Sequence, residues 1–165
     1  MNKLKKLSLA LLASLTLASS ASAYDSYKYV NVGVSAATVA EESATGYDLG
    51  WGFNSYKDNG FFWGIGFDIT LIPLENETVT GFGGDLRLGY TPEFNNHKIA
   101  VYGILTGQGQ DIYGSQAYGF GYGAGASYRL TSWLETDVEY KTYSMTHEIV
   151  DYDSDTVALN LKFTF

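Results

Sequence analysis

Few side chains in this sequence have the type and spacing that catalysis needs. The 165 residues include two histidines and no cysteine, which excludes disulfides, thiolate zinc sites and cysteine nucleophiles. Ser144, His147 and Glu148 supply the residue types of a Ser-His-acid catalytic set within five positions. On a β-strand, however, Ser144 and His147 would point to opposite faces. We therefore expect a solvated loop histidine and no enzymatic activity, and these three residues are the first to test if activity exists.

Acidic side chains are the other candidates for chemistry. The segment from Asp151 to Asp155 resembles the start of a calcium-binding loop, but Thr156 replaces the required glycine and Lys162 the required glutamate. We therefore expect no metal site and no cofactor. Nine acidic residues lie in or beside four polar segments without lysine or arginine: Glu41, Glu42, Glu75, Glu77, Asp111, Glu148, Asp151, Asp153 and Asp155. We interpret them as a solvated rim.

The first 23 residues predict a cleaved secretory signal peptide. A positive start (Lys3, Lys5, Lys6) precedes an apolar stretch and the small residues Ala21-Ser22-Ala23, whereas a core helix would not need all three parts in this order. Removing three of ten basic residues leaves seven against 18 acidic residues, a net charge of −11 for residues 24–165. This balance disfavours nucleic acid as a partner.

Residues 24–165 have the alternation of a β protein in a single domain. Apolar residues recur with period two, and no second segment has the 18 apolar residues of a membrane helix. The chain also has 19 glycines and 16% aromatic residues. The predicted strands of about ten residues, long enough to cross a bilayer at a tilt, are 29–36, 47–54, 61–70, 82–90, 99–106, 118–130, 134–141 and 157–165. Connections of alternating length, with longer ones at 38–45, 72–78, 107–116 and 146–154, predict an all-β, eight-stranded antiparallel up-and-down transmembrane β-barrel.

The two faces of these strands differ in residue type. One face is aromatic and aliphatic, and the other is mostly glycine with a few charges. Glycine would be wasteful on a water-facing surface but suits the narrow interior of a small barrel, so we place the aromatic face toward lipid. The alternative is a secreted, lipocalin-like barrel with an apolar interior. Ile99 to Thr106 is apolar on both faces, so its orientation stays open.

This assignment brings charges of both signs into the interior. They should form a hydrogen-bonded network, because unpaired charges are costly in a narrow lumen. A three-residue turn at 131–133 would place Arg129 directly opposite Glu135. The network is interpreted as a polar plug, with a gated pore or proton path as the alternative. The predicted members are Asp48, Asp68, Asp85, Arg87, Arg129, Glu135, Asp137, Glu139, Lys141 and Lys162.

The last strand, residues 157–165 with Leu161, Phe163 and the terminal Phe165, resembles the C-terminal assembly signature of bacterial outer-membrane barrels. The stretches 119–130 and 133–140 resemble the small barrels of the OmpA, OmpX and opacity-protein type. The resemblance implies a Gram-negative outer-membrane location and recognition by the barrel-assembly machinery. It also implies both termini in the periplasm. In a departure from full OmpA-type proteins, we expect no peptidoglycan-binding domain after Phe165.

These observations favour a monomer with a structural or adhesin-like surface role, whose partners are outer-membrane lipid and lipopolysaccharide. One alternative is a narrow, porin-like pore of low conductance. A lipid A-modifying enzyme is a further alternative, although the His-x-Ser arrangement of barrel-type lipid A deacylases is missing. For the acidic segments, the alternative to a solvated rim is weak divalent-cation binding that docks them against lipopolysaccharide.

Overall fold

The computed structural model describes residues 25–39, 41–57, 60–75, 78–94, 97–112, 114–147 and 151–165. The predicted signal peptide at 1–23, Glu77 and Glu148 lie outside the described residues. Within the described ranges, no helix has the length and apolar content needed to cross a membrane.

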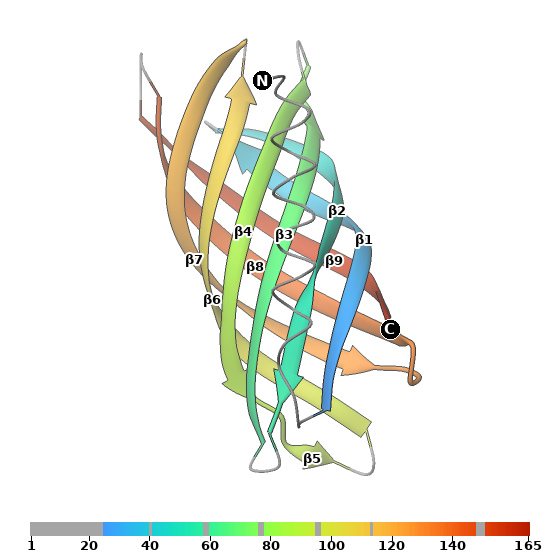
Figure 1. Cartoon of the computed structure of the whole chain (residues 1–165). Helices are drawn as coiled ribbons and strands as arrows, with labels where there is room; N and C mark the ends of the chain where they lie inside the picture. The colour runs from blue at the N-terminus through green and yellow to red at the C-terminus, as the bar shows by residue number, and fades with distance from the viewer. Residues whose placement is uncertain are drawn as a thin grey trace, which may run out of the picture.

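The described chain is a closed antiparallel barrel of eight long strands, as predicted (Figure 1). Each long strand pairs with its sequence neighbour, and pairing of the first strand with the last closes the barrel. A two-residue strand, β5, pairs only with the start of β6. The strands are β1 (Asp25–Val39), β2 (Glu42–Tyr56), β3 (Phe61–Pro73), β4 (Thr78–Tyr90), β5 (Glu93–Phe94), β6 (His97–Ile112), β7 (Ser115–Arg129), β8 (Leu134–Thr146) and β9 (Tyr152–Thr164).

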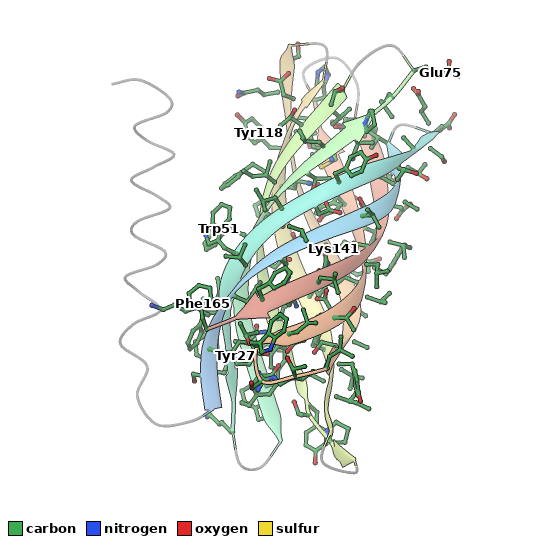
Figure 2. All side chains as sticks on the ribbon, turned by 90° about the vertical axis from the view of Figure 1, so that its right-hand side faces the viewer. Tyr27, Trp51, Glu75, Tyr118, Lys141 and Phe165 are labelled. Atoms are coloured by element: carbon green, nitrogen blue, oxygen red, sulfur yellow. The ribbon has the colours of Figure 1, made fainter. Side chains whose placement is uncertain are left out.

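The two chain ends of the barrel meet at one end of the molecule. The backbone N–H of Lys28 donates to the carbonyl of Phe165 (3.1 Å), and the N–H of Phe165 donates back (3.0 Å). Figure 2 shows Tyr27 and Phe165 toward this end, Lys141 at mid-height and Glu75 at the opposite end. We call these the Phe165 end and the Glu75 end.

The prediction of longer connections at the Glu75 end was wrong. The long strands have 13–16 residues, and pairing continues to Val39 with Glu42 and to Ile112 with Ser115. Gly114 adopts a φ of 74°, which suits a tight hairpin turn. The apolar alternation stops before the hydrogen-bonded ladder does, so the predicted loops 38–45 and 107–116 are mostly strand.

Period-two geometry divides each strand between the two faces. Val32, Leu49 and Leu159 point outward and are exposed, whereas Tyr29 and Phe62 point inward and are buried. On β6 the exposed side chains are the odd-numbered ones, such as Leu105, and the even-numbered ones are buried. This decides the orientation that the sequence left open.

At the Glu75 end the polarity of the wall reverses. The interior there holds two buried apolar clusters, Ala37-Val39-Ile72-Val79 and Ala117-Tyr143-Met145. Most outward positions at the same level are polar and exposed: Ser43, Thr45, Thr78, Thr80, Asp111, Gln116, Ser144, Thr146 and Asp153. We call these nine residues the outer collar. At the level of the collar, polar side chains face outward and apolar ones inward, as in a water-soluble barrel. In the rest of the wall the apolar side chains face outward.

Candidate functional site

An ion-pair network crosses the middle of the barrel. The Arg87 guanidinium, from β4, lies 3.0 Å from Glu139 Oε1 on β8 and 3.1 Å from Asp85 Oδ2. The Lys141 ammonium, also from β8, lies 2.6 Å from Asp85 Oδ2 and 3.3 Å from Glu139 Oε2. Its distance to Asp68 Oδ1 on β3 is 3.7 Å. Except for Asp68, these side chains are almost completely buried, so each charge is stabilised by an opposite one in a desolvated place.

A second set of pairs lies toward the Phe165 end. Lys162 on β9 pairs with Asp137, and its ammonium lies 3.8 Å from Glu135 Oε1. The Arg129 Nε lies 3.9 Å from Glu135 Oε2. The strand register aligns Arg129 with Glu135, which confirms the predicted pairing across the turn. Because Glu135, Asp137, Glu139 and Lys141 alternate along β8, one strand carries four of these charges inward.

Three tyrosines that the sequence analysis did not select belong to the network. The Tyr102 hydroxyl lies 2.9 Å from Asp137 Oδ2 and 3.0 Å from Glu139 Oε1. Arg87 donates a hydrogen bond to the Tyr29 hydroxyl, and the Tyr27 hydroxyl donates to Glu135 Oε2 at 2.5 Å. Tyr102 was missed because its segment is apolar on both faces. Gln108 and Gln110, six and eight residues later, lie on the same face of the strand as Tyr102 and are buried with it. Their polar side chains are the sequence signal that this face points into the barrel.

An aromatic layer covers the network on the Phe165 side. The ring centre of Phe62 lies 4.9 Å from that of Tyr56 and 5.3 Å from that of Tyr102. The Arg129 guanidinium carbon lies 4.1 Å from the ring centre of Tyr27, and Tyr27 is stacked on Tyr56. These contacts combine ring packing with cation–π attraction.

Between the network and the apolar clusters of the Glu75 end lies a small cavity. Its volume is about 30 Å³, room for about one water molecule. Its lining is mainly polar and includes Asp48, Asp68, Thr70, Gln108 and Gln110.

Nine of the ten predicted interior charges form ion pairs with one another. The tenth, Asp48, lies at this cavity and accepts a hydrogen bond from the Thr70 hydroxyl, at 2.8 Å.

The candidate catalytic residues are not brought together as a set among the described residues. Ser144 is exposed on the outward face and donates a hydrogen bond to Asp153 Oδ1 at 3.2 Å. His147 follows the last residue of β8, and Glu148 lies outside the described residues. The described part of the chain also has no group of three or more His, Cys, Asp or Glu residues placed to hold a metal ion.

The acidic residues of the predicted rim that the structure describes are spread over the Glu75 end. Glu42, Asp111, Asp153 and Asp155 lie on strands rather than in loops. The Glu75 backbone N–H donates to Glu42 Oε1 at 3.0 Å, which links two hairpins. At the other end, the predicted assembly residues Leu161, Phe163 and Phe165 all point outward and are exposed.

Comparison with solved structures identifies the fold. Neisserial surface protein A (NspA) superposes with a TM-score of 0.54 at 16% identity, covering 85% of this chain and 97% of that one. Ail of Yersinia pestis has a TM-score of 0.49 at 16% identity, over 87% and 100% of the two chains. A de novo designed transmembrane β-barrel has a TM-score of 0.48 at 16% identity, over 84% and 95%. No protein-family model and no curated protein matches the sequence.

The similarity to NspA confirms the predicted architecture, a small eight-stranded barrel of the outer-membrane type. At this level of identity the comparison concerns the fold, so the function has to be argued from the geometry of this chain.

Proposed function

We propose that this protein is an outer-membrane β-barrel with a plugged lumen and a structural or surface-interaction role. The outward face supports the membrane location, since it exposes large apolar side chains on every long strand. A water-soluble barrel of this size would not present such a continuous apolar surface.

The position of the bilayer follows from the change in polarity along the wall. On β9 the outward side chains Leu161, Leu159 and Val157 are apolar, and the next two outward positions are Asp155 and Asp153. Crossing the hydrocarbon takes about 9–11 residues of a tilted strand, fewer than the 13–16 of these strands. The outer collar therefore stands above the membrane, with its acidic side chains in water.

The filled interior is the observation that carries the proposed role. The aromatic layer, the ion-pair network and the apolar clusters follow one another along the barrel. Opening a path would separate buried opposite charges, which is costly in a desolvated interior. A rigid plugged barrel suits a protein that supports the envelope and presents its collar to surfaces outside the cell.

Cell fractionation combined with heat-modifiable gel migration tests the location. We expect the mature chain in the outer-membrane fraction, migrating faster unheated than heated because the folded barrel is compact. Recovery in the soluble periplasmic fraction would overturn the assignment of the aromatic face to lipid.

A narrow pore is the second candidate, favoured by the polar lining of the cavity between network and apolar clusters. Single-channel recording in planar bilayers separates the two roles. The plugged barrel predicts no reproducible conductance steps from the refolded protein. Regular conductance steps that disappear when the protein is heat-denatured would show that the lumen is a pore and not a plug.

A further inference from the structure

A hollow runs along the outward wall of the barrel over β4, β6 and β7. Its upper part has a volume of about 940 Å³ and lies between Phe82 on β4 and the rings of Tyr118 and Phe120 on β7. Tyr118 lies toward the Glu75 end (Figure 2). A second hollow of about 370 Å³ lies nearer the Phe165 end, and Gly107 and Phe120 line both. The two hollows therefore adjoin, and we call them together the wall groove.

Glycines form the floor of the wall groove. The strand register aligns Phe67, Gly84, Gly107 and Phe120 in one row across β3, β4, β6 and β7, so two positions without a side chain lie between two rings. A Cβ on Gly107 would meet no atom closer than Phe120 Cε1, at 3.5 Å. The packing of the barrel therefore has room for a side chain at this position. A strand glycine of this kind marks a place where a ligand can approach the backbone closely.

The wall groove crosses the boundary between the apolar wall and the outer collar. Its lower end is formed by the paired residues Leu86 and Leu105. From Thr80 to Leu86, β4 covers about 20 Å of strand, which at a tilt near 45° is about 14 Å of depth, close to one leaflet of a hydrocarbon core of about 30 Å. An occupant of the whole groove is therefore an amphiphile of one leaflet, with its chain in the apolar part. Five of the nine collar residues line the upper end: Thr80, Asp111, Gln116, Ser144 and Thr146.

The groups at the upper end select the polar part of the occupant. None of the described residues that line the groove is a lysine or arginine, so a phosphate group would find no opposite charge there. The Asp111 carboxylate, the Gln116 amide and three hydroxyl groups offer acceptors and donors together, which matches the hydroxyl groups of a sugar. Beside them the Tyr118 ring is 62% exposed and offers an apolar face to a sugar ring.

The same charges disfavour a second copy of the chain as the occupant. Two copies inserted in the same direction and docked through their grooves would meet at the same height, because such a contact is symmetric. Asp111 of one copy would then lie against Asp111 of the other. The nine residues of the outer collar include two aspartates and no lysine or arginine to compensate for them. Like charges placed against each other oppose association.

We propose that the wall groove binds a glycolipid of the outer leaflet. Its acyl chain lies over Gly84 and Gly107 between the rings of Phe67 and Phe120, and its sugar head group bonds to Asp111 and Gln116 on the collar. The inference rests on the proposed membrane location, which places the lower part of the groove in hydrocarbon and its upper end in water. It adds a defined lipid partner at one position on the wall.

Native mass spectrometry of the refolded barrel, released from detergent micelles, tests the identity of the occupant. The probes are a glucosyl diacylglycerol and, with the same acyl chains, phosphatidylethanolamine and phosphatidylglycerol. The wild type should retain one equivalent of the glycolipid and less of either phospholipid. Equal retention of the three lipids would contradict the assignment of a sugar head group. Dimers that form without retained lipid would make a second copy the occupant.

Two leucine substitutions on β6 test the position of the groove. Gly107→Leu fills its floor and should weaken glycolipid retention about ten-fold, the effect of displacing about two buried methylene groups. The matched control Gly103→Leu also changes an outward glycine of β6, but Gly103 lines neither hollow, so retention should be unchanged. At the upper end, Asp111→Ala should weaken retention several-fold. Its control Asp151→Ala removes an exposed carboxylate that does not line the groove and should have no effect.

Failure of this inference can be told apart from failure of the proposed location. Heat-modifiable migration first establishes that each variant is folded. Recovery of the chain in the periplasmic fraction would remove the membrane location, and the glycolipid with it. A chain that fractionates with the outer membrane, but retains the glycolipid equally as Gly107→Leu and as Gly103→Leu, would overturn the wall groove alone.

Discussion

The Nε atom of Arg87 on β4 lies 3.0 Å from Glu139 Oε1 on β8, so a buried ion pair joins two strands that are not neighbours in the sheet. The pair connects opposite walls of the barrel directly, in addition to the hydrogen bonds that connect each wall to the next. Glu139 also lies within 3.3 Å of the Lys141 ammonium and 3.0 Å of the Tyr102 hydroxyl. Arg87, Lys141 and Tyr102 therefore all contact this one carboxylate.

The substitution Glu139→Gln should therefore destabilise the barrel strongly. It keeps the shape of the side chain but leaves buried cations without one of their partners, which typically costs about 3–5 kcal/mol. Urea unfolding of the barrel refolded in lipid vesicles measures the change. Val138→Ala, on the outward face of the same strand, is the control for general effects on β8. Equal stability of Glu139→Gln and wild type would show that the pair does not hold the walls together.

The boundary between membrane wall and outer collar predicts a contrast between two arginine substitutions. Leu159→Arg places a charge in the apolar part of the wall and should cost about 2–4 kcal/mol of folding free energy in vesicles. Thr146→Arg places the same charge on the outer collar and should cost about 0–1 kcal/mol. In detergent micelles the difference should shrink. Similar costs in vesicles would mean that the bilayer does not end where the outward polarity changes.

Two glycines on opposite faces of neighbouring strands make a matched pair. A Cβ on Gly125 would lie 2.5 Å from Cε2 of Tyr102, the residue it pairs with, whereas the nearest atom to a Cβ on Gly103 is 4.0 Å away. Gly125→Ala should displace Tyr102 from the network and cost about 1–3 kcal/mol. Gly103→Ala should be neutral or stabilise by about 0.5–1 kcal/mol. The free energy of unfolding of each variant tests whether Gly125 faces the interior and Gly103 the outside. A larger loss for Gly103→Ala than for Gly125→Ala would contradict this assignment.

The resemblance of the last strand to an assembly signature predicts a defect that occurs only in cells. Phe165→Ala keeps the backbone hydrogen bonds with Lys28 but removes an exposed terminal ring. The amount of folded barrel in the outer membrane should fall several-fold, while refolding of the purified protein in detergent should be unchanged. Phe120→Ala, which removes a ring that is 85% exposed on β7, is the control. A refolding defect of the same size in detergent would assign Phe165 to stability rather than to assembly.

Much of the interior could be predicted from alternation alone. Because side chains on a strand alternate between faces, Glu135, Glu139 and Lys141 had to share one face of β8, and a three-residue turn was enough to align Arg129 with Glu135. Tyr102 was not assigned, since both faces of residues 99–106 are apolar, and the polar residues in its phase, Gln108 and Gln110, come only after that segment. The prediction of long loops at 38–45 and 107–116 was wrong because it took the end of the apolar alternation for the end of the strand. Hairpins such as Val39–Glu42 continue the ladder into a region where the wall is no longer apolar.

The sequence by itself determined the class of the fold and the face of most strands, because period two and residue type are local properties of the chain. It also determined which charges share the interior. Only the tertiary structure decided which of them meet, since Arg87 and Glu139 are brought together by closure of the barrel and by the stagger of its strands. The same closure places Asp68 3.7 Å from the Lys141 ammonium and leaves Asp48 hydrogen-bonded to Thr70, because a distance across the lumen depends on the register of every strand between the two residues.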